Sequence, residues 1–126
     1  MNKKIRNKKI SFLGVTFKAN TDDMRDSSSL KLIPFLSKKG AKIKYYDPTG
    51  SKKEFKKLKN VEFSNSIKES IKGSDIVILH TEWNDFKLLN FKKLTKKKKF
   101  KIYDMRNMYS PSIMKKLKID YFGIGR

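Results

Sequence analysis

Several side chains in the segment GVTFKANTDDMRDSSSL, residues 14–30, could together bind an anion. Lys18 offers an ammonium directly after an apolar run, where it could face a phosphate or a carboxylate. The serines at 27–29 open a predicted helix, whose free N–H groups and dipole also favour negative charge. The alternative for Lys18 is a solvated loop position, which is the commoner outcome in a chain this rich in lysine.

Arginine is rare in this chain, so the positions where it occurs are expected to need the planar guanidinium group. Four of the 32 basic residues are arginine, at positions 6, 25, 106 and 126. A guanidinium binds two oxygen atoms of a phosphate or carboxylate at once, which an ammonium does not. Arg25 and Arg106 are therefore candidate anion-binding residues. A structural ion pair with a nearby aspartate, at position 22, 23 or 104, explains them equally well.

Two residues that occur once each, His80 and Trp83, close the most apolar run of the chain. The position of His80 favours a buried, hydrogen-bonded core residue over a general acid or base. The position of Trp83 favours packing at the edge of a sheet over stacking on a nucleic-acid base.

The motifs that would supply catalysis are absent. The segment GVTFKAN has one glycine where a dinucleotide-binding fingerprint has Gly-x-Gly-x-x-Gly. The chain has no Walker loop, no cysteine, and no cluster of histidines and cysteines with metal-ligand spacing. The sequence therefore predicts neither a catalytic residue nor a metal site.

Strand and helix patterns alternate along the chain. Apolar runs predict strands at 8–17, 41–48, 61–63, 74–81 and 99–107, and an edge strand close to the end. Helical patterns cover 27–40, 51–60 and 66–73, then 82–94 as helix followed by loop, and a short stretch within 112–125. The serines should cap the first helix and Gly40 should end it. This alternation predicts a three-layer α/β/α domain with a mainly parallel, Rossmann-like sheet.

Four of the expected strands are followed by unusual polar or aromatic residues: Lys18, Asp47, Glu82, Trp83, Asp104 and Arg106. The carboxyl ends of parallel strands meet at one edge of a sheet, where open α/β folds bind their ligands. The sequence therefore predicts a binding site at this edge.

The composition suits one folded domain with a strongly basic surface. The chain has 126 residues, 37% of them hydrophobic, enough for a single core. It has no apolar run long enough to span a membrane, no secretory signal pattern and no cysteine, so we expect a cytoplasmic protein. The net charge of +20 reflects either a surface biased towards lysine or a protein that attracts anions. Both interpretations predict non-specific binding to nucleic acid at low salt.

Three motifs occur in a characteristic order. The first is GVTFKANTDDMRDSSSLKLIPFLSKKGAKIKYYDP, the second is SDIVILHTEWNDFKLLNF, and the third is IYDMRNMYSP. Together they resemble the C-terminal, UDP-binding domain of the UDP-glucose/GDP-mannose dehydrogenase family. The family pattern is Gly-x-x-Phe-Lys, Asn-x-x-Asp-x-Arg and Tyr-Asp-Pro, then Thr-Glu-Trp-x-x-Phe, then Asp-x-Arg-Asn. The resemblance covers residues 9 to about 122, almost the whole chain.

The resemblance implies a function in an NAD-dependent oxidoreductase. Such enzymes oxidise the C6 alcohol of a nucleotide sugar twice, and the Thr-Glu-Trp form is similar to those that convert UDP-glucose to UDP-glucuronate. Phe17, Lys18 and Arg106 match positions that contact the UDP-sugar, and Arg25 matches one that reaches NAD. The family's catalytic cysteine and lysine and its Gly-rich segment belong to other parts of the enzyme. This chain alone is therefore expected not to be catalytically competent.

The resemblance also implies partners and boundaries. N-terminal NAD-binding and central dimerisation domains are expected in cis or as a separate chain. Residues 9–126 are interpreted as the UDP-sugar-binding domain and residues 1–8 as a basic lead-in or linker remnant. Two alternatives stay open, a small basic nucleic-acid-binding module and an inactive gene fragment.

Overall fold

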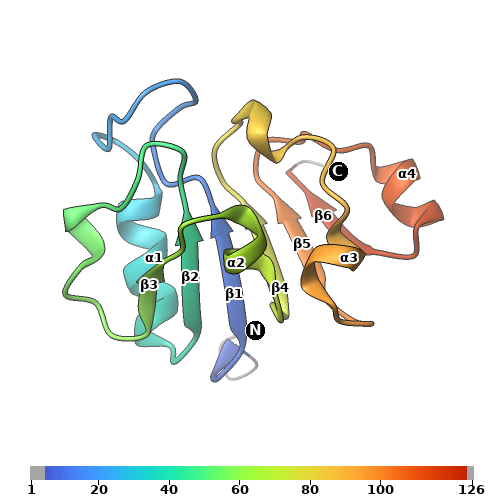
Figure 1. Cartoon of the computed structure of the whole chain (residues 1–126), viewed down its shortest axis with the longest axis horizontal. Coiled ribbons are helices and arrows are strands. Elements are labelled where there is room, and N and C mark those ends of the chain that lie inside the picture. The colour runs from blue at the N-terminus through green and yellow to red at the C-terminus, as the bar shows by residue number, and fades with distance from the viewer. Residues whose placement is uncertain (1–4, 125–126) are drawn as a thin grey trace.

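One parallel sheet forms the centre of the protein. The structure, a computed structural model, describes residues 5–124 (Figure 1). The strands are β1 (Lys9–Leu13), β2 (Lys42–Tyr46), β3 (Val61–Phe63), β4 (Ile76–Leu79), β5 (Lys101–Asp104) and β6 (Asp120–Gly123). Their order across the sheet is β3-β2-β1-β4-β5-β6, and every neighbouring pair is parallel. The predicted α/β fold with a Rossmann-like sheet is confirmed, including the edge position of the last strand.

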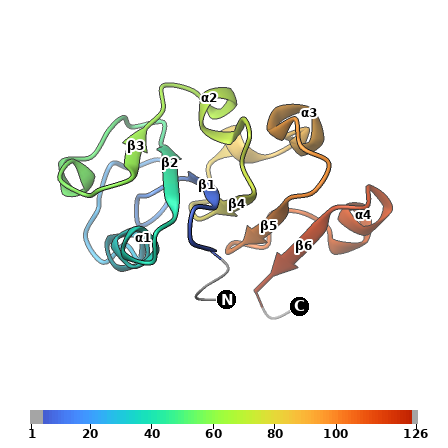
Figure 2. The same cartoon turned by 90° about the horizontal axis from the view of Figure 1, so that it is seen from below.

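The helices cover the two faces of the sheet unequally (Figure 2). They are α1 (Ser29–Lys38), η2 (Lys53–Phe55), α2 (Ile67–Ile71), η3 (Asn84–Phe86), α3 (Phe91–Thr95) and α4 (Pro111–Lys116). From β1 the chain steps outwards to β2 and β3, and after β3 it steps in the opposite direction through β4 to β6. Because such crossovers are right-handed, α1 and η2 lie on one face, and α2, α3 and α4 lie on the other.

Two apolar clusters fill the space between the sheet and its helices. Alternate residues of β4 serve both clusters: Ile76 and Ile78 face the α1 side, while Val77 and Leu79 face the α2 and α3 side. A strand covered on both faces needs apolar residues at every position, which explains the run IVIL. The carboxyl ends of the strands consequently have fixed positions, because both faces of the central strands are packed.

Two of the predicted helices are wrong in form. The segment 51–60 forms only the short helix η2, because Phe55 is its one fully buried apolar side chain among many lysines. The segment 82–94 contains η3 and α3, separated by Leu88, whose φ of 64° no helix accommodates. Asn90 then starts α3 by accepting a hydrogen bond from the backbone N–H of Lys93.

The first helix ends as expected but does not begin so. Gly40 has a φ of 93° and its N–H donates to the carbonyl of Ser37, which closes α1 in a Schellman motif with Ala41. Ser28, at the N-cap, makes no capping hydrogen bond. The hydroxyl of Ser27 instead accepts from the N–H of Ser29 at 3.3 Å, so the predicted serine cap is formed only in part, and the serines also bind the loop after β1, as described below.

The described part of the basic lead-in belongs to the folded domain. Ile5 is 4% exposed, and the N–H of Asn7 donates to the carbonyl of Gly40 at 2.9 Å. Residues 1–4 lie outside the described residues. Across residues 5–124, no helix combines the length and the apolar character that a membrane crossing requires.

Candidate functional site

The loop that follows β1 is held in place by the ends of β2 and β4. Gly14 has a φ of 83°, and a Cβ there would lie 2.5 Å from the Cβ of Thr81. Asp47, 1% exposed, accepts hydrogen bonds at Oδ2 from the backbone N–H groups of Val15 (2.8 Å) and Thr16 (3.4 Å). The hydroxyl of Thr81 donates to the carbonyl of Thr16 at 2.9 Å. The loop is thus anchored through its backbone on both sides.

This anchored loop presents Phe17 and Lys18 to solvent. Phe17 is 46% exposed, and Lys18 is also exposed. The N–H of Phe17 donates to the carbonyl of Asp23 at 3.0 Å, so the next loop segment folds back on this one. An exposed aromatic ring on a fixed loop, with an ammonium beside it, suits contact with a ligand.

Arg106 lies beside Phe17 at the same edge of the sheet. Its Nε donates to the carbonyl of His80 at 2.9 Å, and its Nη2 donates to the carbonyl of Phe17 at 3.0 Å. It has no ion pair with a carboxylate among residues 5–124; its backbone N–H, instead, binds the carboxylate of Asp104. The ion pair with Asp104 that the sequence allowed is therefore not formed. The guanidinium joins the ends of β1, β4 and β5.

Arg25 forms the ion pair that was the alternative interpretation. Its Nε and Nη2 donate to the two carboxylate oxygens of Asp23 at 3.0 and 3.1 Å. The hydrogen bonds from Arg25 are the main reason that the pKa of Asp23 lies below its usual value, and Lys18 adds a smaller electrostatic contribution. The Arg25 side chain remains 88% exposed. It is not among the hydrogen-bond partners of Arg106.

The serines at the start of α1 bind the loop rather than an anion. The hydroxyls of Ser27 and Ser29 both donate to the carbonyl of Val15 at 2.6 Å. The N–H of Ser29 bonds to the Ser27 hydroxyl, and the N–H of Leu30 bonds to the Ser27 carbonyl. Because these hydroxyls and N–H groups already have partners, the helix start does not form the predicted anion site.

His80 lies directly beneath this arrangement and is a buried core residue, as predicted. Its side chain is 1% exposed and bonds through Nε2 to the hydroxyl of Ser28 (2.8 Å) and through Nδ1 to that of Thr81 (3.1 Å). Since the Thr81 hydroxyl donates to the carbonyl of Thr16, Nδ1 carries the proton and Nε2 accepts from Ser28. Burial first, and Arg106 second, lower the pKa of His80 to about 4. The imidazole is therefore neutral at physiological pH.

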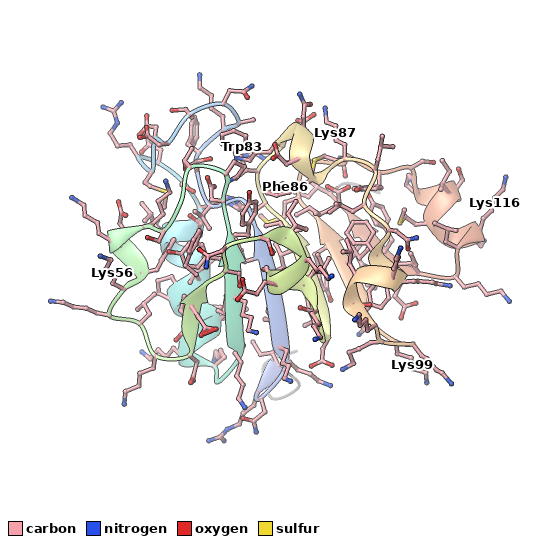
Figure 3. All side chains as sticks on the ribbon, in the orientation of Figure 1. Lys56, Trp83, Phe86, Lys87, Lys99 and Lys116 are labelled. Atoms are coloured by element: carbon pink, nitrogen blue, oxygen red, sulfur yellow. The ribbon has the colours of Figure 1, made fainter. Side chains whose placement is uncertain are left out.

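Trp83 packs at the edge of the sheet, as the sequence predicted. It is 8% exposed, lies at the carboxyl edge above Phe86, and its indole Nε1 has no hydrogen-bond partner among the described residues (Figure 3). Glu82, next to it, is exposed. No group of histidines, cysteines and carboxylates within residues 5–124 could hold a metal ion.

The structure therefore brings Phe17, Lys18 and Arg106 to one edge, and pairs Arg25 with Asp23, whose carbonyl accepts from the N–H of Phe17. Sequence reasoning missed Thr81, which holds the loop, and Ser28, which bonds to His80 beneath it. The signal for Thr81 was present, since it is a polar residue two positions after the end of the most apolar strand. No signal marked Ser28 as the partner of a histidine 52 residues away.

Known proteins resemble this chain in both sequence and fold. The model of the UDP-glucose/GDP-mannose dehydrogenase family, UDP binding domain, matches residues 11–111. The UDP-glucose 6-dehydrogenases of Rickettsia felis and Rhizobium meliloti are 36% and 37% identical over 96% and 97% of this chain. The chain spans 28% of the length of each.

Solved structures agree with this assignment. An NDP-N-acetyl-D-galactosaminuronic acid dehydrogenase from Methanosarcina mazei superposes with a TM-score of 0.84 at 26% identity, over 98% of this chain and 26% of its own. A UDP-D-ManNAc dehydrogenase from Pyrococcus horikoshii gives 0.76 at 26% identity over 98% of this chain and 27% of its own. The resemblance seen in the sequence is confirmed, and the chain belongs to the UDP-glucose/GDP-mannose dehydrogenase family, of which it contains the UDP-binding domain.

Proposed function

We propose that this chain binds a UDP-sugar, UDP-glucose in the first instance, at the carboxyl edge of its sheet. The proposal rests on one observation above all: a loop anchored through its backbone holds Phe17 exposed, Lys18 beside it, and Arg106 bonded to the Phe17 carbonyl. The phenyl ring offers an apolar contact to a base or sugar, and the ammonium offers a charge-assisted hydrogen bond to a phosphate. The likeness to UDP-glucose 6-dehydrogenases supports UDP-glucose as the sugar nucleotide.

Arg106 acts in this proposal mainly by fixing the loop. Its guanidinium already donates to two backbone carbonyls, and those bonds set the position of Phe17 relative to the end of β5. A lysine at 106 would keep the charge but could not span both carbonyls with a planar fork. The substitution Arg106→Lys should therefore loosen the loop without changing the net charge.

NAD is the cofactor that we propose for the complete enzyme, in which it would accept hydride from C6 of the sugar. The described residues fit it in part. The exposed guanidinium of Arg25 could meet a dinucleotide phosphate. The hollow of about 570 Å³ beside it is also lined by Asp22, Asp23 and Glu54, whose carboxylates oppose an anion. Most of the NAD-binding surface is therefore assigned to a domain that the 126 residues do not contain.

The same comparison supports a proposal for what this chain contributes to the complete enzyme. The relatives are more than three times as long as the matched region, since that region is 28% of each. The 126 residues contain no cysteine, so the family's catalytic thiol has to come from an N-terminal domain, in cis or on a separate chain. In this proposal the chain contributes substrate contacts and is not catalytically competent alone.

The binding of UDP to the 126-residue protein tests the proposal. Isothermal titration with UDP, and then with UDP-glucose, should be done near physiological ionic strength, because a net charge of +20 attracts any anion at low salt. Lys18→Ala should weaken binding about tenfold, the equivalent of losing one charge-assisted hydrogen bond. Lys116→Ala changes an exposed lysine on α4, at the opposite end of the molecule from the loop after β1 (Figure 3); it removes the same charge and should leave the affinity unchanged.

Two outcomes would contradict the proposal. Equal losses for Lys18→Ala and Lys116→Ala would mean that UDP is held by overall charge. If pyrophosphate bound as tightly as UDP, the uridine group would make no contact that contributes to the affinity. Arg25→Ala should leave UDP affinity unchanged, since the proposal assigns that guanidinium to NAD.

A further inference from the structure

Positive charge is concentrated at one edge of the sheet. The segments that lead into the strands, at the amino edge, contain twelve lysines and arginines and one carboxylate; they are residues 5–8, 39–41, 56–60, 72–75, 96–100 and 117–119. The segments that leave the strands, at the carboxyl edge, contain five basic and six acidic residues; they are residues 14–28, 47–52, 64–66, 80–90 and 105–110. A surface that merely favoured lysine would be basic at both edges. The net charge of +20 is therefore carried chiefly by the amino edge.

The one carboxylate in the amino-edge segments, Asp75, already has its partners. It forms an ion pair with Lys97 and accepts a hydrogen bond at Oδ2 from the backbone N–H of Lys9 at 2.9 Å. No other lysine within residues 5–124 forms an ion pair. The ammonium groups at this edge repel one another, and a bound polyanion would relieve that repulsion.

Four of the lysines surround a hollow of about 450 Å³ at the amino ends of β1, β2 and β3: Lys9, Lys42, Lys44 and Lys72. Lys42 and Lys44 alternate along β2 with Ile43, which packs on the α1 side, so both lysines project on the α2 side. Glu62 on β3 is the one carboxylate in the lining. This part of the sheet face thus carries exposed lysine where a covered strand carries apolar residues.

Helix ends explain only some of these lysines. In a parallel α/β fold the helices end at the amino edge, and their dipoles favour cations in the last turn, as at Lys38 of α1 and Lys116 of α4. Lys9, Lys42 and Lys44 lie on strands, so no helix end accounts for them. Their grouping around a hollow indicates a ligand.

The chemistry of the hollow selects the kind of ligand. Its lining contains no aromatic side chain, whereas proteins that bind single-stranded nucleic acid stack the bases on aromatic rings. Protein interfaces are likewise enriched in aromatic residues and depleted in lysine. Lysine supplies a point charge without the planar fork that reads base edges. A concave group of ammonium ions suits the convex phosphate backbone of a duplex better than a flat membrane.

The amino edge is long enough to contact several phosphates. Six strands at about 4.8 Å spacing make an edge of roughly 24 Å. One strand of a DNA duplex carries a phosphate about every 3.4 Å, so this length corresponds to about seven phosphates. Lys99 lies at this end of the molecule and extends the basic surface beyond the hollow, whereas Lys87 lies at the opposite end (Figure 3).

From these observations we infer that the amino edge binds double-stranded nucleic acid through its phosphate backbone, without a preference for base sequence. The phosphate contacts are assigned to Lys9, Lys42, Lys44 and Lys72. The inference does not depend on the proposed UDP site, which lies at the carboxyl edge. UDP and the duplex are therefore expected to bind at the same time.

Fluorescence anisotropy tests this inference on the 126-residue protein, with a labelled DNA duplex of about 20 base pairs in about 0.15 M salt. The amino-edge variant combines Lys42→Gln, Lys44→Gln and Lys72→Gln. The matched control combines Lys31→Gln, Lys53→Gln and Lys87→Gln, at or near the carboxyl edge. All six lysines are exposed, and both variants lose three positive charges.

The amino-edge variant should lose far more affinity than the control. Each phosphate contact contributes about 0.9 to the slope of log affinity against log salt, so the loss of three contacts should reduce the slope by about 2.7 and the affinity about a hundredfold. The control should change the affinity less than about threefold. Arginine also binds phosphate, so Lys42→Arg, Lys44→Arg and Lys72→Arg together should keep the affinity. A duplex of different sequence should bind equally well.

Four results would each overturn the inference: no binding of the duplex at this salt concentration, equal losses for the two glutamine variants, competition between UDP and the duplex, and tighter binding to phosphatidylserine vesicles or to a single strand than to the duplex. The amino-edge variant should keep the UDP affinity of the unchanged protein. A failure of this inference is therefore distinguishable from a failure of the proposed UDP site.

Discussion

Mild acid, between about pH 7.5 and about pH 5, should destabilise this protein chiefly through one residue, His80. The folded state holds the imidazole neutral at a pKa of about 4, chiefly because the ring is buried and secondly because Arg106 is close. The unfolded chain has the ordinary histidine pKa of about 6.5 and therefore binds a proton at pH values where the folded chain does not. The stability that follows from the neutral ring is fully present above about pH 6.5 and is lost as the pH falls towards 4.

The magnitude follows from the two pKa values. Proton linkage gives a loss of about 2 kcal/mol in the free energy of unfolding between about pH 7.5 and about pH 5. The remaining loss comes below pH 5, where protonation of carboxylates also contributes; the pKa of Asp23 and that of Asp75 lie below their usual values in the folded state. The interval above pH 5 therefore isolates the histidine.

Urea denaturation at a series of pH values measures this loss. Trp83 is the sole tryptophan and is buried, so its fluorescence reports unfolding without added labels. His80→Gln is the control, because it keeps a polar side chain but does not titrate, and its stability should be flat over the same interval. His80 is also the only histidine, so its NMR titration is unambiguous. A measured pKa near 6.5, or equal pH profiles for the two proteins, would refute the reasoning.

Two further predictions concern the residues that anchor the loop after β1. Gly14→Ala should cost about 3 kcal/mol, because it combines a left-handed backbone with a clash against Thr81; Gly50→Ala, with φ of 96° and open space around it, should cost only about 1 kcal/mol. Asp47→Asn should cost about 2 kcal/mol, because each carboxylate oxygen accepts from two donors and an amide NH₂ would face N–H or O–H groups.

Thermal or urea unfolding measures both effects. Asp120→Asn, on an exposed residue of the edge strand, is the matched control for Asp47→Asn and should change stability by less than about 0.5 kcal/mol. Equal costs for the two glycine substitutions would show that Thr81 does not limit the space at Gly14. An unchanged stability of Asp47→Asn would show that the loop does not depend on that carboxylate.

The arrangement of strands could be predicted from the sequence because it depends on local patterns. Apolar or alternating runs, followed by Gly14 after β1, by Asp47-Pro48 after β2 and by His80 after β4, place these three strands to within a few residues. The segment 51–60 was misjudged as a helix, since only Phe55 and Leu58 are apolar and the local pattern is weak. The segment 82–94, predicted as helix followed by loop, instead forms two short helices. Leu88, with its left-handed backbone, carries no sequence signal for that conformation.

The sequence by itself determined that this is an α/β domain of a recognisable family, and that Phe17, Lys18 and Arg106 follow strands ending at one edge of a sheet. Only the tertiary structure decided what those residues bind within the chain. Arg106 donates to backbone carbonyls, which have no side-chain signature, and Ser28 meets His80 across 52 residues. Local patterns specify elements, whereas contacts between distant residues exist only once the sheet has brought them together.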